Sequence, residues 1–253
     1  MKSRDTAWIA GVRIDRMDMQ ASVRAALDLI ESGTPHQHVV VNAAKLVAAQ
    51  NDPALMEILN GCSLINADGQ SVVWASRLLR DPLPERVAGI DFMNELIERA
   101  HENNLRIYLL GASSDVVEKV ATEFERRGAN VVGYRNGYWG GSTSDRLVAE
   151  EIAALNVDVL FVAIPSPAKE IFLQRYLDTL NVGLAVGVGG SFDVVAGKTS
   201  RAPRVLQRLG LEWLFRLAQE PRRMARRYFV GNSKMVLLIL RSMFRRPRGA
   251  RIE

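Results

Sequence analysis

A single carboxylate stands where an apolar run ends. Asp68 follows the apolar residues 63–67, and Gly69 after it allows the backbone to turn sharply. Chemistry that removes a proton from a hydroxyl needs a base in such an open position. The alternative is structural, because Asp is a preferred N-cap and QSVVWASRLL at 70–79 predicts a helix. The local pattern favours the base and the cap about equally.

Three further polar side chains are candidates for ligand contacts. Asn42 also ends an apolar run and precedes the predicted helix AAKLVAAQ, so its amide could bind a sugar hydroxyl or cap that helix. Taken alone, the cap is favoured. Arg86 and Asp91 lie in PERVAGIDF as candidate polar contacts, and the alternative for them is a solvated ion pair on a loop.

Two turns contain glycine where an anion could bind. GASSD at 111–115 precedes a predicted helix, whose first amides and dipole favour an anion. It lacks a complete dinucleotide fingerprint and the P-loop lysine, so a tight turn with a Ser or Asp cap is at least as well supported. The cluster Gly187, Gly189 and Gly190 follows a buried run and is the stronger candidate, because glycines let the backbone approach a ligand closely.

These residues need a scaffold that brings strand ends together. Short β-rich runs alternate with amphipathic helical stretches, at residues 38–42, 63–68, 106–111, 130–134, 157–165 and 182–190. This alternation predicts an α/β fold with a Rossmann-like, mostly parallel sheet and helices on both faces. Ligands of such sheets bind beyond the carboxyl ends of the strands, and all the candidates above lie there.

The chain changes character after Gly197. Residues 201–253 hold 14 Lys or Arg and three acidic residues, whereas residues 1–200 hold 19 and 25. We therefore predict an α/β catalytic core at 1–197 and a basic helical appendage at 198–253. The appendage contains interleaved Leu, Ile, Phe and Met, which favours an anionic membrane surface over nucleic acid as its partner.

Two amphipathic helical stretches are expected in the appendage, at 211–218 and 222–244, with Pro221 suited to a first helical turn. They have no further strand to cover, so they either pack on the core as a lid or present an apolar face to lipid. Four arginines lie within a few turns of one another and could bind a diphosphate or touch anionic lipid: Arg216, Arg223, Arg226 and Arg227.

Composition narrows the chemistry. One cysteine, Cys62, and three histidines are too few for an internal disulfide or for most metal sites built from these residues. We therefore expect no cofactor, and chemistry that either needs no metal or uses a metal carried by a substrate. No signal peptide is evident, and the longest apolar run of the appendage, residues 235–240, is far short of the roughly 20 residues that span a bilayer. We expect a cytoplasmic protein lying on the inner face of the cell membrane, monomeric or a homo-oligomer.

Several motifs, in order along residues 8–230, resemble the WecG/TagA/CpsF family of bacterial glycosyltransferases, glycosyltransferase family 26. They are VNAAKLV, NADGQSVVWASRL, PERVAGIDF, YLLGAS, GYRNGYW, GVGGSFDVVAGKTSRAP and LGLEWLFRLAQEPRRMARRY. The resemblance implies inverting, metal-independent transfer of a sugar from a UDP-sugar to a polyprenyl-diphosphate-linked saccharide. It also implies that Asp68 is the base, that Asn42 and Arg86 contact substrate, and that appendage arginines lie over the diphosphate: Arg216, Arg223 and Arg226.

Two positions depart from the pattern that many members share. Val40 replaces a threonine two residues before Asn42, and Lys169 replaces a glutamine in PAKE. Lys169 could meet a phosphate or a sugar carboxylate, which suggests a different donor or acceptor from the amino-sugar members. We expect a hexose donor and a role in exopolysaccharide synthesis.

Three other functions remain as alternatives. A Rossmann-type oxidoreductase would need a complete dinucleotide fingerprint, which is not evident. A nucleic-acid-binding protein would use the basic appendage, whose apolar residues argue for lipid instead. A non-catalytic membrane scaffold would leave Asp68, Asn42 and Arg86 without a joint purpose.

Overall fold

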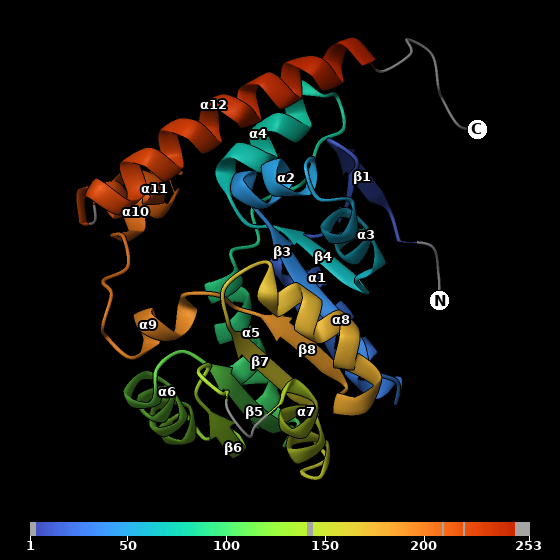
Figure 1. The fold of residues 1–253 in the computed structure, drawn as a ribbon, viewed down its shortest axis with the longest axis vertical. Helices are drawn as coiled ribbons and strands as arrows, with labels where there is room; N and C mark the ends of the chain where they lie inside the picture. Colours follow the sequence, from blue (N-terminus) through green and yellow to red (C-terminus); the bar gives the residue numbers. More distant parts are fainter. Residues whose placement is uncertain (1–3, 141–143, 209, 220, 246–253) are drawn as a thin grey trace.

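The fold is that of an α/β protein built on one parallel sheet. The structure, a computed structural model, describes residues 4–140, 144–208, 210–219 and 221–245. Neighbouring strands of the sheet are parallel in every pairing. From edge to edge the strands are β4 (Leu64–Ala67), β3 (His36–Val41), β8 (Leu184–Gly187), β7 (Val159–Ala163), β5 (Arg106–Gly111) and β6 (Asn130–Arg135) (Figure 1).

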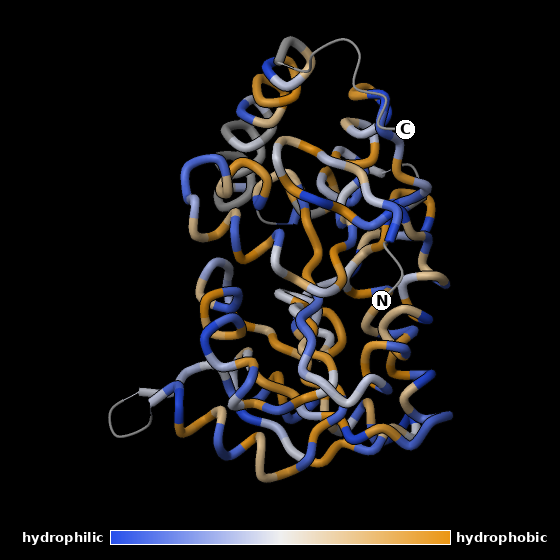
Figure 2. The backbone as a smooth tube through the Cα atoms, turned by 90° about the vertical axis from the view of Figure 1, so that its right-hand side faces the viewer, coloured by the Kyte–Doolittle hydropathy of each residue, from blue (hydrophilic) through white to orange (hydrophobic). Residues whose placement is uncertain are grey.

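Helices cover both faces of this sheet, as predicted. Side chains alternate along β5, so that Leu109 packs on one face and Tyr108 and Leu110 pack on the other. The first face is covered by α1 (Met19–Glu31), α5 (Gly89–Glu102) and α6 (Ser114–Arg126). The second is covered by α7 (Asp145–Ala153) and α8 (Ala168–Leu180). Figure 2 shows hydrophobic and hydrophilic stretches alternating along the chain.

A third apolar cluster lies at the β3–β4 end of the sheet. It joins α2 (Ala43–Ala49), α3 (Pro53–Gly61) and α4 (Gln70–Leu78) to an antiparallel hairpin of β1 (Thr6–Ile9) and β2 (Val12–Asp15). The sequence analysis missed this hairpin. Its turn is formed by Ala10 and Gly11, both with positive φ, and Ala-Gly is a weaker hairpin signal than Asn-Gly or Asp-Gly.

The appendage is helical, as predicted. After the short α9 (Ser191–Val195) come α10 (Arg204–Arg208), α11 (Glu212–Gln219) and α12 (Pro221–Arg245), and α12 runs past α2 and α4 (Figure 1). Met235 and Ile239 of α12 are buried in the cluster that contains α2. Val236, Leu240 and Met243 form a second apolar stripe that stays exposed. The two roles expected for the appendage, packing on the core and facing lipid, thus concern different faces of α12. The domain division at residue 197 stays a prediction.

Candidate active site

Asp68 lies directly after β4 at the carboxyl edge of the sheet, where the sequence places it. Its N–H donates to the Val41 carbonyl at 2.8 Å, which fixes the backbone beside the end of β3. Gly69 has a φ of +141°, so glycine is needed for the turn that follows. Gly69 also occupies the N-cap of α4, and no side chain caps that helix. The interpretation of Asp68 as the N-cap residue of α4 is therefore wrong, and its half-buried side chain lies at the sheet edge.

Asn42 lies next to the same turn and does cap its helix. Its Oδ1 accepts a hydrogen bond from the Lys45 N–H at 3.0 Å, so the cap prediction is confirmed. A Cβ on Gly69 would lie 3.8 Å from the Asn42 Cβ, which places the two strand ends side by side. The cap uses only the amide oxygen. Among the described residues no hydrogen bond is recorded for its Nδ2, which leaves a donor for a ligand.

Stability and turnover should separate at Asn42. Asn42→Ala removes the cap and should lower the free energy of unfolding by about 1 kcal/mol, whereas Asn42→Ser retains a capping oxygen. If the amide nitrogen contacts substrate, both variants should lose turnover by about tenfold or more. Urea denaturation and steady-state kinetics on the same preparations measure the two effects. If Asn42→Ser has wild-type turnover, Asn42 caps the helix but does not contact substrate.

A buried ionic cluster lies under this edge. Glu170 Oε1 accepts hydrogen bonds from Lys45 Nζ and from Ser166 Oγ, each at 2.8 Å, and Lys169 Nζ lies 3.6 Å away. Burial would raise the pKa of Glu170, but the two lysines and these hydrogen bonds hold it at about 2. Burial and the charge of Lys45 lower the pKa of Lys169 to about 8, against the opposing charges of Glu170 and Asp68. The cluster therefore brings cations from α2 and α8 close to the candidate base.

The glycine turn after β8 is part of the same arrangement. A Cβ on Gly187 would lie 2.6 Å from Lys169 Cε, so only glycine leaves room for that side chain. Gly189 has a φ of +54°, and Gly190 is the N-cap of α9. Since β8 pairs with β3, this turn lies beside the end of β3, which Asn42 follows. The turn and Lys169 thus lie together, whereas the binding of a ligand by either stays a prediction.

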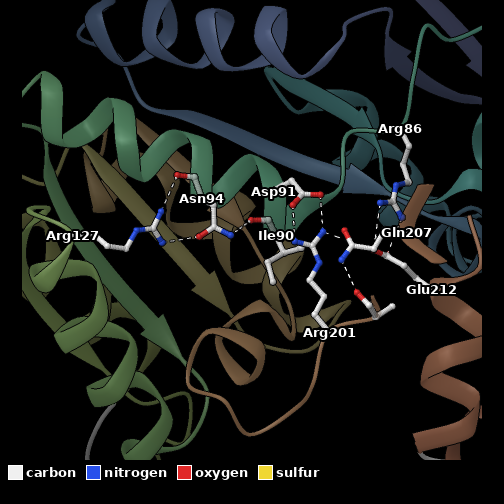
Figure 3. Close-up of polar contacts among 9 residues, drawn as sticks. Arg86, Ile90, Asp91, Asn94, Arg127, Arg201, Gln207 and Glu212 are labelled. Atoms are coloured by element: carbon white, nitrogen blue, oxygen red, sulfur yellow. Dashed lines mark hydrogen bonds and ion pairs between the residues drawn. The ribbon is translucent and has the colours of Figure 1, made fainter. Parts of the chain in front are cut away.

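Arg86 and Asp91 are both ion-paired, but not with each other. Arg86 Nη1 donates to Glu212 Oε2 of α11 at 2.8 Å, and Arg201 binds both carboxylate oxygens of Asp91 at 2.7 Å (Figure 3). Arg201 Nη2 also lies 3.7 Å from Glu212 Oε1, which joins the two pairs into one chain. The alternative of a solvated loop pair is therefore wrong, because the partners come from the appendage and the Arg86 side chain is only 14% exposed.

The start of the appendage closes on the turn that carries Asp68. A Cβ on Gly210 would lie 2.7 Å from Gln70 Cγ, two residues after Asp68. Burial lowers the pKa of Arg201, but its bond to Asp91 and the charges of Asp91, Glu212 and Asp68 together raise it above its ordinary value. Asp68 thus lies within electrostatic range of Lys169 on one side and of Arg201 on the other. Core and appendage meet at the candidate base.

Some predicted residues lie elsewhere or outside the description. The turn at 111–115 ends β5, three strands from β3, with Ser113 at the N-cap of α6. It borders an open pocket lined by Tyr134 and Tyr138. The backbones of three predicted diphosphate-binding arginines lie in α11 and α12, but their side chains fall outside the described part: Arg216, Arg223 and Arg226.

Within the described ranges, no three His, Cys, Asp or Glu side chains group as metal ligands would. No helix in the same ranges has the length and apolarity to span a bilayer. Metal independence stays a prediction.

Sequence reasoning missed Lys45, Arg201 and Glu212. Lys45 carries a signal, since it is the only charged residue in the predicted helix AAKLVAAQ and faces the core three residues after Asn42. Arg201 and Glu212 stand within two motifs of the resemblance, but neither motif indicates a partner more than 100 residues away.

Comparison with known proteins gives a consistent result. The profile described as "Glycosyl transferase WecG/TagA/CpsF family" matches residues 7–249. An "N-acetylglucosaminyldiphosphoundecaprenol N-acetyl-beta-D-mannosaminyltransferase" of Bacillus subtilis (strain 168) is 36% identical over 200 residues, which are 78% of this chain and 77% of the relative. A protein of the same name from Bacillus spizizenii (strain ATCC 23059 / NRRL B-14472 / W23) is 36% identical over 182 residues, 70% of this chain and 69% of the relative.

Proposed function

Because the chain belongs to the WecG/TagA/CpsF family of glycosyltransferases, we propose that it transfers a sugar from a UDP-sugar to a polyprenyl-diphosphate-linked saccharide at the cytoplasmic face of the membrane. The names of the two Bacillus relatives specify an acceptor of this kind, N-acetylglucosaminyldiphosphoundecaprenol. The proposed product belongs to the synthesis of exopolysaccharide or another cell-surface polysaccharide. The reaction inverts the anomeric centre and needs no metal.

The observation that carries the proposal is the position of Asp68. Its carboxylate stands at the carboxyl edge and lies between charges from the core and from the appendage. In the proposed reaction Asp68 accepts the proton of an acceptor hydroxyl while that oxygen attacks the anomeric carbon of the donor. The bond from that carbon to the diphosphate oxygen breaks, and UDP leaves. One displacement of this kind converts an α-linked donor into a β-linked product.

The leaving diphosphate carries negative charge that the protein must stabilise. The backbone amides of Gly189 and Gly190 and the ammonium group of Lys169 are suited to this, because preorganised donors act strongly in a site from which water is excluded. We propose that the guanidinium groups of Arg216, Arg223 and Arg226, from the appendage, also contact the diphosphate. The ion-pair chain from Asp91 to Arg86 holds the start of the appendage where it can deliver them.

A transfer assay tests the proposal directly. The purified chain should move radiolabelled sugar from at least one UDP-sugar to a polyprenyl-diphosphate-linked N-acetylglucosamine, with excess EDTA present. UDP-N-acetylmannosamine, UDP-glucose and UDP-glucuronate would distinguish the donor of the Bacillus relatives from the hexose donor that the sequence suggests. Transfer from no UDP-sugar to any polyprenyl-diphosphate acceptor would refute the proposal, and transfer only with added divalent metal would refute metal independence.

A further inference from the structure

Lys169 has an unusual position for a lysine. It is the second residue of α8, which follows the end of β7 at the carboxyl edge, yet the residue is only 4% exposed. Lysine is almost never buried to this degree unless its charge is paired. Its methylene chain crosses the end of β8 in the space that Gly187 leaves, and a Cβ there would lie 3.2 Å from Nζ. The ammonium group is thereby fixed under the glycine turn.

The charge of Lys169 is only partly balanced by its neighbours. The nearest carboxylate, Glu170, already accepts short hydrogen bonds from Lys45 and Ser166, and its distance of 3.6 Å to Lys169 Nζ is that of a weaker ion pair. Lys45 adds a second positive charge close to Lys169, and Asp68 adds a negative one. His38 on β3 adds none at neutral pH, since burial lowers its pKa to about 3.

We propose that the Lys169 ammonium group binds an anionic oxygen of the donor. This inference rests on the proposed function. The oxygen belongs either to the diphosphate or to a carboxylate on the transferred sugar. Asp68 holds the acceptor hydroxyl on one side of the reacting carbon, and Lys169 binds the donor from the β8 side. Lys45 and Ser166 fix the Glu170 carboxylate by hydrogen bonds, and that carboxylate lies 3.6 Å from the Lys169 ammonium group.

A dependence on pH follows from the same environment. With no ligand bound, burial lowers the pKa of Lys169 to about 8, so the charged form decreases as pH rises through 8. A bound anion favours the charged form, and donor affinity should therefore fall between pH 7 and pH 9. Of the groups that face Lys169, Glu170 has a pKa of about 2 and His38 of about 3, so neither changes charge in this interval.

The experiment measures binding of UDP, UDP-glucose and UDP-glucuronate by calorimetry to wild-type protein, Lys169→Gln and Lys169→Met at pH 7, and to the wild type at pH 9. Lys119→Gln, which changes an exposed lysine on α6, is the matched control and should bind as the wild type does. If the affinity for all three ligands falls by about tenfold or more in both Lys169 variants, Lys169 contacts the diphosphate. If only the affinity for UDP-glucuronate falls, Lys169 contacts the carboxylate of the sugar.

Wild-type affinity of both Lys169 variants for all three ligands overturns the inference but leaves the proposed function standing. Absence of any binding to the wild type overturns both. If neither variant folds, the wild type alone decides the question, because an affinity that is constant from pH 7 to pH 9 contradicts a bound Lys169 ammonium group.

Discussion

Replacing Asp68 by Asn should reduce the turnover number about 10²–10⁴-fold, the usual contribution of a general base. The asparagine amide has the shape of the carboxylate but cannot accept the proton of an attacking hydroxyl. Stability should change little, because asparagine keeps the shape of the side chain and the turn conformation depends on Gly69. Affinity for UDP should also remain near that of the wild type, since the proposed contacts to the diphosphate come from other residues.

Single-turnover transfer assays measure the loss, with UDP binding and urea denaturation as checks that the site and the fold persist. Asp28→Asn is a matched control, because it makes the same chemical change at an exposed position on α1. Turnover of Asp68→Asn within a few fold of the wild type would exclude Asp68 as the base. A large loss of UDP affinity would instead assign Asp68 to donor binding.

The sequence predicted the strand ends well because they depend on local chemistry. The apolar runs that end at Val41 and Ala67 are buried strands, and the small or polar residues after them turn into helices. Parallel pairing then places Asn42 and Asp68 at one edge with no further information needed. The helix caps could not be predicted in the same way, because Asn and Asp both cap helices well. The structure shows that Asn42 caps α2, whereas Gly69, and not Asp68, occupies the N-cap of α4.

Long-range ion pairs could not be predicted in this way. Arg86 and Glu212 are separated by 126 positions, and Arg201 and Asp91 by 110. Nothing local distinguishes these side chains from solvated charges, because the partner is defined only when the appendage folds back on the core. The environment of Lys169 was hidden for the same reason, since it depends on the approach of α2 to α8 and on the space left at Gly187.

The appendage carries the second prediction with a large effect, and the structure shows which face to change. Met235 and Ile239 are buried against the core, so deleting the appendage would expose the apolar surface beneath them and confuse loss of folding with loss of function. Val236 and Leu240 are 59% and 44% exposed, one helical turn apart. Changing both to Glu alters the outer stripe and leaves the packed face intact.

Val236→Glu/Leu240→Glu should lose most binding to anionic vesicles and most transfer to a long-chain polyprenyl acceptor. Each apolar side chain that enters the membrane contributes about 1.5–3 kcal/mol, and each new carboxylate is repelled by anionic lipid. Vesicle sedimentation should therefore show a fall in affinity of about two orders of magnitude or more. Transfer to a short-chain, water-soluble acceptor should persist, because the ion-pair chain and the buried face keep the appendage in place.

Leu147→Glu is the matched control, since Leu147 is 46% exposed on α7, at the opposite end of the molecule from α12 (Figure 1). It should bind vesicles as the wild type does. If the double variant binds vesicles normally, the outer stripe of α12 is not the membrane contact. If it loses the soluble acceptor as well, the stripe acts within the catalytic site. Retention of the soluble reaction with loss of the lipid reaction would separate the two faces of α12, one completing the site and the other locating the lipid-borne acceptor.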